Sequence, residues 1–316
     1  MTNIRRPYLF AVTLAAGALV LAGCGAEEAP SNAAGNGGGD DVAAPETTVD
    51  DDLRELLPQE ILDEGIAVVG SPYTSPPLIF VDGAGEPTGA AYDLSMAIGE
   101  VLGIEIEWED LAFPGIIPGL QAGNIDLSMG VIAATAERQE TLDMVMLFNN
   151  ESALLTQKGN PQGVTDLAEA CGLTVGGLAG SHQLERVKGF SDECVDRGED
   201  PISINEYSSQ ADGQAALQSE RIAAYFAPYL TLNHVALTAG GGEIFELGSG
   251  FYPDNPFGIA IQKDRGDLAE AVRGALEKLV QDGTYQEILD SYDSGFAALS
   301  EEQIVVNGAG TDLFPL

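Results

Sequence analysis

The stretch Gly123-Asn-Ile-Asp-Leu-Ser-Met-Gly-Val-Ile-Ala-Ala-Thr-Ala-Glu-Arg-Gln-Glu-Thr-Leu-Asp143 turns an apolar segment into a polar turn that contains a single arginine, Arg138. Its apolar run, residues 125–131, is short, which is typical of a strand buried in an α/β sheet. Ligands of such sheets bind beyond the carboxyl ends of the strands, where Arg138 lies. We therefore predict that its guanidinium grips a carboxylate through two parallel hydrogen bonds. A surface salt bridge with Glu137 or Glu140 is the alternative.

Length and charge restrict the class of protein. The chain has 316 residues, 45% of them apolar, which fits about two globular domains. Thirteen basic against 50 acidic residues give a net charge of -37. This excess repels phosphate backbones and anionic membrane surfaces, so we do not expect nucleic-acid binding.

The N-terminus has the features of a secretion signal. Arg5 and Arg6 precede an apolar run, residues 8–20, that is too short to span a membrane. The run closes with Leu21-Ala22-Gly23-Cys24, which resembles a bacterial lipobox. We predict a signal peptide at residues 1–23 and a lipidated Cys24 that anchors an extracytoplasmic protein to the cell membrane. An ordinary secreted protein or a free thiol is the alternative.

Residues 24–52 contain almost nothing to bury, because they are mostly Gly, Ala, Asn, Pro, Glu and Asp. This composition predicts a disordered tether. No later segment reaches about 18 uninterrupted apolar residues, so we predict no membrane-spanning helix.

After the tether, strand and helix patterns alternate. We predict strands over residues 66–70, 104–108, 125–129, 153–156, 173–177, 202–204, 223–227 and 257–261. Helices are predicted over residues 92–102, 116–122, 164–170, from 182 onward, 211–219, 268–279 and 285–289. This repeated alternation of strands and helices predicts two α/β lobes: lobe 1 from residues 53–156 and 258–316, and lobe 2 from residues 157–257.

The two remaining cysteines, Cys171 and Cys194, lie outside the reducing cytosol if the protein is exported. We predict a disulfide between them, which would close a loop of about two dozen residues. A metal site is the poorer alternative, because His182 and His234 lack ligand spacing. We expect no metal and no cofactor.

The order of several segments resembles the bacterial solute-binding proteins of ABC importers, and among them solute-binding family 3, the polar amino acid binders. These segments are Leu57-Pro58, residues 65–70, 76–82, 89–94 and 113–122, Gly123-Asn124-Ile125-Asp126, Thr135-Ala136-Glu137-Arg138, residues 175–181 and Asp282-Gly283-Thr284-Tyr285. The resemblance covers the chain from about residue 53 to the C-terminus. It implies a periplasmic-binding-protein-like α/β fold, with two lobes joined by a two-strand hinge and a ligand cleft between them. It also implies a monomeric receptor that delivers a small solute to a membrane permease.

The resemblance implies roles for particular residues. Arg138 stands where the family's arginine grips the ligand's α-carboxylate, with Ala136 in place of the motif's proline. Ser181 and His182 follow Gly180 where the family has a Gly-Thr-Thr motif at a helix N-terminus, whose hydroxyl and N–H groups bind the same carboxylate. Phe113 stands where an aromatic side chain packs against the ligand, although a core aromatic is an equal alternative.

The acceptors that the family uses for the ligand's ammonium are missing. Their positions hold Pro72, Ala133 and Pro228. Burying an ammonium without acceptors costs several kcal/mol. This cost is enough to abolish a typical micromolar affinity, which corresponds to about -8 kcal/mol. We therefore predict a carboxylate solute without a free α-amine.

We expect this solute to lie between apolar walls from Phe113 and Tyr73, with Tyr225 or Tyr229 as further candidates. In the alternative, an acid elsewhere in the chain restores the amine site. The candidates are Glu206, Asp212 and Asp254.

Other functions use the same fold. A cyclohexadienyl-dehydratase-like enzyme needs a general acid or base in the cleft, and no motif places one. Ser181 and His182 are neighbours in sequence rather than a nucleophile oriented by a base, so we predict no catalytic residues. A sensory domain, or a lipoprotein that holds a partner at the envelope, is the remaining alternative.

Overall fold

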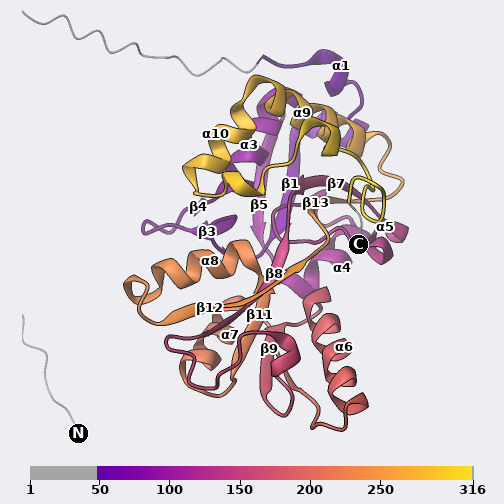
Figure 1. The fold of residues 1–316 in the computed structure, drawn as a ribbon. Helices are drawn as coiled ribbons and strands as arrows, with labels where there is room; N and C mark the ends of the chain where they lie inside the picture. The colour runs from indigo at the N-terminus through magenta and orange to yellow at the C-terminus, as the bar shows by residue number, and fades with distance from the viewer. Residues whose placement is uncertain (1–47, 315–316) are drawn as a thin grey trace, which may run out of the picture. The chain divides into compact units, whose positions relative to one another are not determined.

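Two five-stranded sheets with matching connectivity organise the chain (Figure 1). The computed structural model describes residues 48–314. The predicted signal peptide, the lipidation site Cys24 and most of the predicted tether lie outside the described residues. Among residues 48–314, no helix has the length and apolarity needed to cross a membrane.

The first sheet has the strand order β5-β1-β6-β13-β7. Strand β1 runs parallel to β5 and β6, whereas β13 runs antiparallel to β6 and β7. Its strands are β1 (Ile66–Ser71), β5 (Glu105–Asp110), β6 (Leu127–Ser128), β7 (Leu142–Phe148) and β13 (Phe257–Gln262). A small sheet lies beside it, made of β2 (Thr74–Ser75), β3 (Ile79–Val81) and β4 (Pro87–Thr88).

The second sheet repeats this plan with the order β10-β9-β11-β8-β12. Strand β9 runs parallel to β10 and β11, and β8 runs antiparallel to β11 and β12. Its strands are β8 (Glu151–Gln157), β9 (Thr174–Leu178), β10 (Ser203–Tyr207), β11 (Ala224–Pro228) and β12 (Phe245–Pro253). The two sheets are the cores of two α/β lobes, as the sequence predicts.

Helices cover both sheets. They are α1 (Asp51–Arg54), α2 (Gln59–Glu64), α3 (Ala90–Leu102), α4 (Ile116–Ala122), α5 (Ala136–Thr141), α6 (His182–Asp196), α7 (Gln210–Gln218), α8 (Tyr229–Thr238), α9 (Leu268–Asp282) and α10 (Thr284–Ser291). Helix α9 shows why the sequence folds this way: Leu268, Val272 and Leu279 lie on one face and are buried. It ends at Gly283, whose φ of 91° lies in the left-handed region that glycine tolerates.

The chain crosses between the sheets twice, and both crossings differ slightly from the predicted boundaries. Strand β8 pairs with β11 and β12, so residues 151–156 belong to lobe 2 rather than to lobe 1. The first crossover is therefore residues 149–150, and the second is residues 254–256, between β12 and β13. Asn150 Nδ2 donates to the carbonyl of Asn255 at 3.1 Å, so the two crossovers are hydrogen-bonded to each other.

The predicted tether ends earlier than expected, because Asp50, Asp51 and Asp52 take part in the fold. Asp51 and Asp52 begin helix α1, and the Asp50 side chain accepts a hydrogen bond from the backbone N–H of Leu53. Asp50 also forms a salt bridge with Lys278 of α9. A cap and an ion pair thus order three residues whose composition alone suggested a flexible segment.

Other elements also differ from the prediction. The helix predicted over residues 164–170 is a single 3-10 turn, η2 (Leu167–Glu169), since Gly172 then turns the chain with a φ of 74°. The sequence did not predict β7, β12 or α8. Strand β7 follows α5 without any turn residue, and β12 contains two glycines, a closing proline and a register shift.

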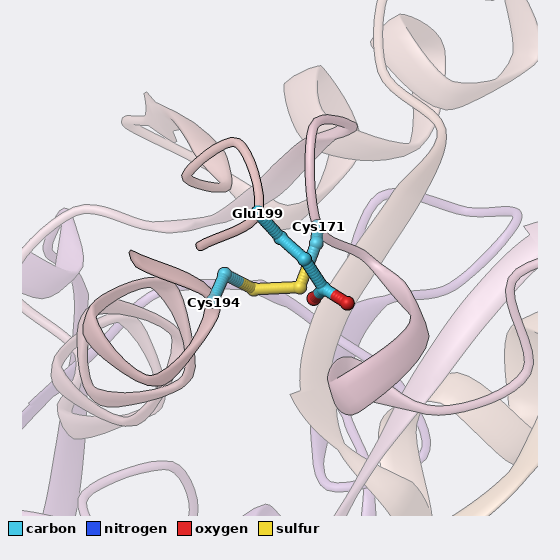
Figure 2. A group of neighbouring side chains, drawn as sticks. All are labelled: Cys171, Cys194 and Glu199. Atoms are coloured by element: carbon cyan, nitrogen blue, oxygen red, sulfur yellow. A yellow bond between two sulfur atoms is a disulfide. The ribbon is translucent and has the colours of Figure 1, made fainter. Parts of the chain in front are cut away.

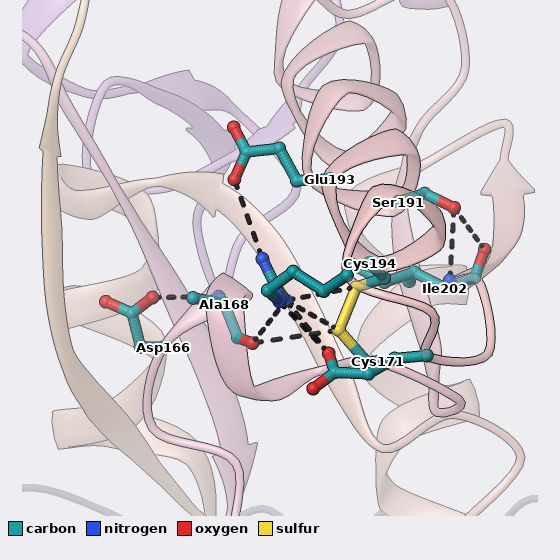
Figure 3. Close-up of a disulfide and its surroundings, with 9 residues drawn as sticks. Asp166, Ala168, Cys171, Ser191, Glu193, Cys194 and Ile202 are labelled. Carbon is teal, nitrogen blue, oxygen red and sulfur yellow. Dashed lines mark hydrogen bonds and ion pairs between the residues drawn. A yellow bond between two sulfur atoms is a disulfide. The ribbon is translucent and has the colours of Figure 1, made fainter.

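The disulfide between Cys171 and Cys194 is confirmed (Figures 2 and 3). It joins the segment after η2 to the C-terminal part of α6. Beside it, the Ser191 hydroxyl and the backbone of Ile202 exchange hydrogen bonds of 3.3 and 3.1 Å. Glu199 completes a group with metal-ligand spacing, but the two sulfur atoms are consumed by the disulfide (Figure 2).

Replacing both cysteines with serine should destabilise lobe 2. The bond closes a loop with a sequence separation of 23, so its loss should cost about 3 kcal/mol and lower the melting temperature by roughly 6 to 12 °C. Thermal unfolding with and without a reductant measures this. The reductant should lower the melting temperature of the wild type and leave that of the double variant unchanged. Equal melting temperatures for the two proteins without reductant would contradict the prediction.

Candidate ligand cleft between the lobes

Arg138 lies in helix α5, and the loop that leads into this helix is hydrogen-bonded to the second crossover and to the start of β13. Thr135 caps α5 by accepting a hydrogen bond from the backbone N–H of Arg138 at 3.2 Å. The N–H of Ala134 donates to the carbonyl of Pro256 at 2.8 Å, and that of Gly258 donates to Ile132 at 3.0 Å. The loop is therefore held at the point where the chain passes between the lobes.

The Arg138 side chain contacts both lobes. Its Nη1 donates to the carbonyl of Ala133 in lobe 1 at 2.9 Å, and its Nη2 donates to the carbonyl of Gly180 in lobe 2 at 3.3 Å. The guanidinium also lies over the ring of Phe113, 5.7 Å from its centre. The half-buried cation is thus shared between the lobes through backbone carbonyls.

No carboxylate among residues 48–314 forms a salt bridge with Arg138, so the surface pair with Glu137 or Glu140 is not formed. Burial lowers the pKa of Arg138, and the charges of Glu137 and Asp254 oppose that shift. A guanidinium stays charged at neutral pH. The cleft therefore holds a positive charge that has no directly paired anion among the described residues.

A cavity beside Phe113, the ring that Arg138 covers, is lined by residues of both lobes, and Arg138 itself is not part of the lining. Its free volume is about 20 Å³, which holds about one water molecule. A larger solute therefore requires the lobes to separate from this conformation. The lining residues are Phe113, Val131, Leu178, Ser181, Gln183, Gln210, Phe226, Ala227, Pro228, Thr231 and Phe257.

Two polar side chains of this lining have buried oxygen atoms without a hydrogen-bond partner among the described residues. They are the hydroxyl of Ser181 and the Oε1 atom of Gln210. Ser181 is the N-cap residue of α6, yet its hydroxyl accepts no bond from the helix. Buried polar atoms are normally paired, so these two are candidates to bind a solute.

Asp254 of the second crossover anchors a buried polar network in lobe 2. Its Oδ1 atom accepts from His182 Nε2 and from the backbone N–H of Asn255, the latter at 2.8 Å. Its Oδ2 atom accepts from Ser152 Oγ and from Gln183 Nε2, the latter at 3.3 Å. Four donors fill about four acceptor sites of a carboxylate. Asp254 therefore has no acceptor site left for a ligand ammonium.

Burial by itself raises the pKa of Asp254, but the hydrogen bond and charge of His182 oppose it. Together with the bonds from Ser152 and Asn255, they hold the pKa below its ordinary value. The other candidate acids lie elsewhere: Glu206 is exposed on β10, and Asp212 of α7 accepts hydrogen bonds from the hydroxyls of Ser208 and Ser209.

The structure brings several of the predicted site residues together. Phe113 and Ser181 line the cavity, and Arg138 lies over Phe113. Ala133 contributes its carbonyl to Arg138. His182 begins α6, but its side chain is bonded to Asp254 and is not part of the cavity lining.

The tyrosines predicted as walls lie elsewhere. The ring of Tyr73 packs against Trp108 with 6.3 Å between ring centres, so it is no wall of this cavity. Tyr225 is fully buried in the lobe 2 core, where it fills the space next to Gly213; a Cβ atom on Gly213 would collide with its ring. Tyr229 packs instead against Phe251 and Phe296.

The sequence did not reveal Gln210, Gln183 or Thr231 as cavity residues. Each stands near the start of a helix that follows a strand of lobe 2. In an α/β lobe, helix starts lie at the carboxyl ends of the parallel strands, where ligands bind. A position at the start of a helix that follows a parallel strand could therefore have indicated all three as cavity residues.

The chain is similar to known binding proteins. The family model described as bacterial extracellular solute-binding proteins, family 3, matches residues 67–295. The arginine-binding protein ArgT of Corynebacterium glutamicum is 28% identical over 256 residues, which cover 80% of this chain and 82% of that protein. The glutamine-binding protein GlnH of Bacillus subtilis is 27% identical over 212 residues, 65% of this chain and 72% of that protein.

A solved structure agrees with these relatives. An ancestral arginine-binding protein bound to arginine is 30% identical, with a TM-score of 0.65 over 72% of this chain and 98% of that one. All three of these proteins are named as binding proteins rather than as enzymes. The two lobes, the hinge of two crossovers and the family model that matches most of the described residues all agree, and the chain belongs to the bacterial extracellular solute-binding proteins of family 3.

Proposed function

We propose that this protein is the lipid-anchored receptor of an ABC importer, which captures a small, amino-acid-like carboxylate between its lobes and delivers it to a membrane permease. One observation carries the proposal. The Arg138 guanidinium is half-buried between the lobes and contacts a carbonyl of each, but it has no carboxylate partner among residues 48–314. A solute carboxylate is the group that such a cation binds best.

Capture would proceed by closure on the solute. The carboxylate would accept hydrogen bonds from Arg138 of lobe 1 and from the Ser181 hydroxyl and the first N–H groups of α6 in lobe 2. Because these groups come from both lobes, the bound solute favours the closed form over the open form. The permease would then recognise the closed surface.

We expect the protein to bind a carboxylate solute whether or not the solute carries an α-amine. Among the described residues, the cavity lining contains no acid, and one of its walls is Pro228, which stands where the resemblance to the family implies an aspartate. Asp254, which is bonded to Gln183 of the lining, is saturated by four donors. An ammonium buried here would lack a charged acceptor.

Calorimetry with matched solutes tests this. L-glutamine is compared with glutaramate, and L-leucine with 4-methylpentanoate, since each pair differs in the α-amine alone. We expect the members of a pair to bind within about tenfold of each other, because the amine gains no charged partner. Amine-free solutes that bind more than about 100-fold more weakly would show that the amine is recognised.

The anchor is tested separately, because Cys24 lies outside the described residues. In cells, the wild type should partition with membranes and the Cys24→Ala variant should not. A wild type that is recovered entirely from the soluble fraction would contradict lipid anchoring.

A further inference from the structure

We propose that Gln210 selects the solute by its distal group, pairing its buried amide with a carboxamide on the solute and rejecting cationic, anionic and apolar groups. This inference rests on the proposed function, because it assumes that the opposite end of the solute is the carboxylate held at Arg138. It assigns a binding role to a residue that the motifs of the sequence did not single out.

The placement of Gln210 follows from the start of α7. Ser209 caps this helix by accepting a hydrogen bond from the backbone N–H of Asp212 at 3.1 Å. Gln210 is therefore the first helical residue, and its side chain lines the cavity. It is only 5% exposed, and its Oε1 atom has no hydrogen-bond partner among residues 48–314.

The other amide and hydroxyl groups of the lining are used within the protein or belong to the carboxylate end. Thr231 donates to the carbonyl of Pro228 at 3.0 Å, and Gln183 donates to Ser152 and Asp254. Ser181 directly follows Gly180, which Arg138 contacts. Gln210 thus remains as the polar group that can bind the rest of the solute.

The chemistry of an amide defines what it pairs with. Gln210 offers both N–H donors and a carbonyl acceptor in one plane. A carboxamide presents the complementary pair. An anionic carboxylate has no donor for the Oε1 atom, and an apolar group leaves the whole buried amide unpaired. A guanidinium or ammonium needs a carboxylate, and the lining provides none within residues 48–314. Because a site built to hydrogen-bond rejects analogues that cannot, we expect discrimination on the order of tenfold to 100-fold.

Calorimetry with the full chain measures the preference. The panel is the twenty standard L-amino acids, L-homoleucine, and four amine-free solutes: glutaramate, glutarate, 5-methylhexanoate and 5-guanidinopentanoate. We expect a carboxamide, either L-glutamine, L-asparagine or glutaramate, to bind most tightly. A cationic, anionic or apolar solute as the tightest ligand would overturn the inference, and so would the absence of binding across the panel.

Variants then assign the preference to Gln210. Gln210→Leu should weaken the best carboxamide by about tenfold to 100-fold and leave its apolar counterpart equal or tighter. Gln210→Glu should shift the preference toward L-arginine or 5-guanidinopentanoate, because it adds a carboxylate to the lining. Gln218→Leu is the matched control, since this exposed residue ends the same helix and its side chain does not line the cavity.

The outcomes separate this inference from the proposed function. If Arg138→Ala abolishes binding but Gln210→Leu and Gln210→Glu leave the ranking of solutes unchanged, the carboxylate grip stands and the role of Gln210 is refuted. If solutes still bind to Arg138→Ala with wild-type affinity, the proposed function itself fails. The affinities are compared separately among the amino acids and among the amine-free solutes. The preference for a distal group can therefore be read whether or not the α-amine contributes to binding.

Discussion

Replacing Arg138 with alanine should weaken the binding of a carboxylate solute by about 100-fold or more, while the solute-free protein keeps nearly the same melting temperature. Removing one partner of a hydrogen-bonded charge pair in a cleft costs about 2 to 5 kcal/mol of binding free energy. In the solute-free protein, Arg138 donates hydrogen bonds to the two carbonyls of Ala133 and Gly180. Each such bond contributes only about 1 kcal/mol net, and truncation also relieves the cost of a half-buried charge.

Calorimetry with the tightest ligand and thermal unfolding without ligand measure the two effects. Arg138→Lys should fall between wild type and alanine, because it keeps the charge but loses the planar fork. Arg221→Ala is the control, since Arg221 is exposed and its Nε atom donates to the hydroxyl of Ser219 outside the cleft. A large loss of stability in solute-free Arg138→Ala would instead indicate that the arginine has a structural role.

Replacing Asp254 with alanine should cause a large loss of stability. The side chain is 1% exposed and accepts from four donors, including His182 of α6 and Ser152 of β8. Breaking such a buried network leaves its donors unpaired and should cost about 3 to 5 kcal/mol. The melting temperature should fall by roughly 10 °C or more.

Thermal unfolding measures this loss, and Glu206→Ala is the matched control because Glu206 is an exposed acid of the same lobe. The control should change the melting temperature by no more than a few degrees. An Asp254→Ala protein as stable as the control would show that the network contributes nothing to stability.

The Asp254 carboxylate should also make the stability of the folded protein depend on pH. The pKa of Asp254 is lower in the folded protein than its ordinary value. Its contribution is therefore complete above the unfolded pKa of about 3.9 and is lost as the pH falls through the lower folded value. Melting temperatures measured between pH 7 and pH 2 should fall less steeply below about pH 4 for Asp254→Asn than for wild type. Parallel curves for the two proteins would contradict this.

Much of the fold is readable from local patterns. The helix over α9 follows from apolar residues at helical spacing, and the strands β1 and β9 follow from short apolar runs between turns. The patterns failed where local signals were weak, as in β12, whose glycines and bulge interrupt the alternation. They also misassigned β8, because a strand's sequence does not state which sheet it joins.

Local properties of the sequence are its periodicity, its turn residues and the spacing of its motifs. From these alone one could predict the alternation of strands and helices, the cysteine pair and the position of Arg138 beyond a strand. The sequence could not predict which buried polar groups lack a hydrogen-bond partner within the protein. One of the four donors that saturate Asp254 is Ser152, which is 102 residues away in sequence, whereas Gln210 and Ser181 each bring an oxygen atom to the cavity that has no partner among the described residues. Hydrogen-bond satisfaction depends on contacts between distant segments, and those contacts exist only once the two sheets have formed.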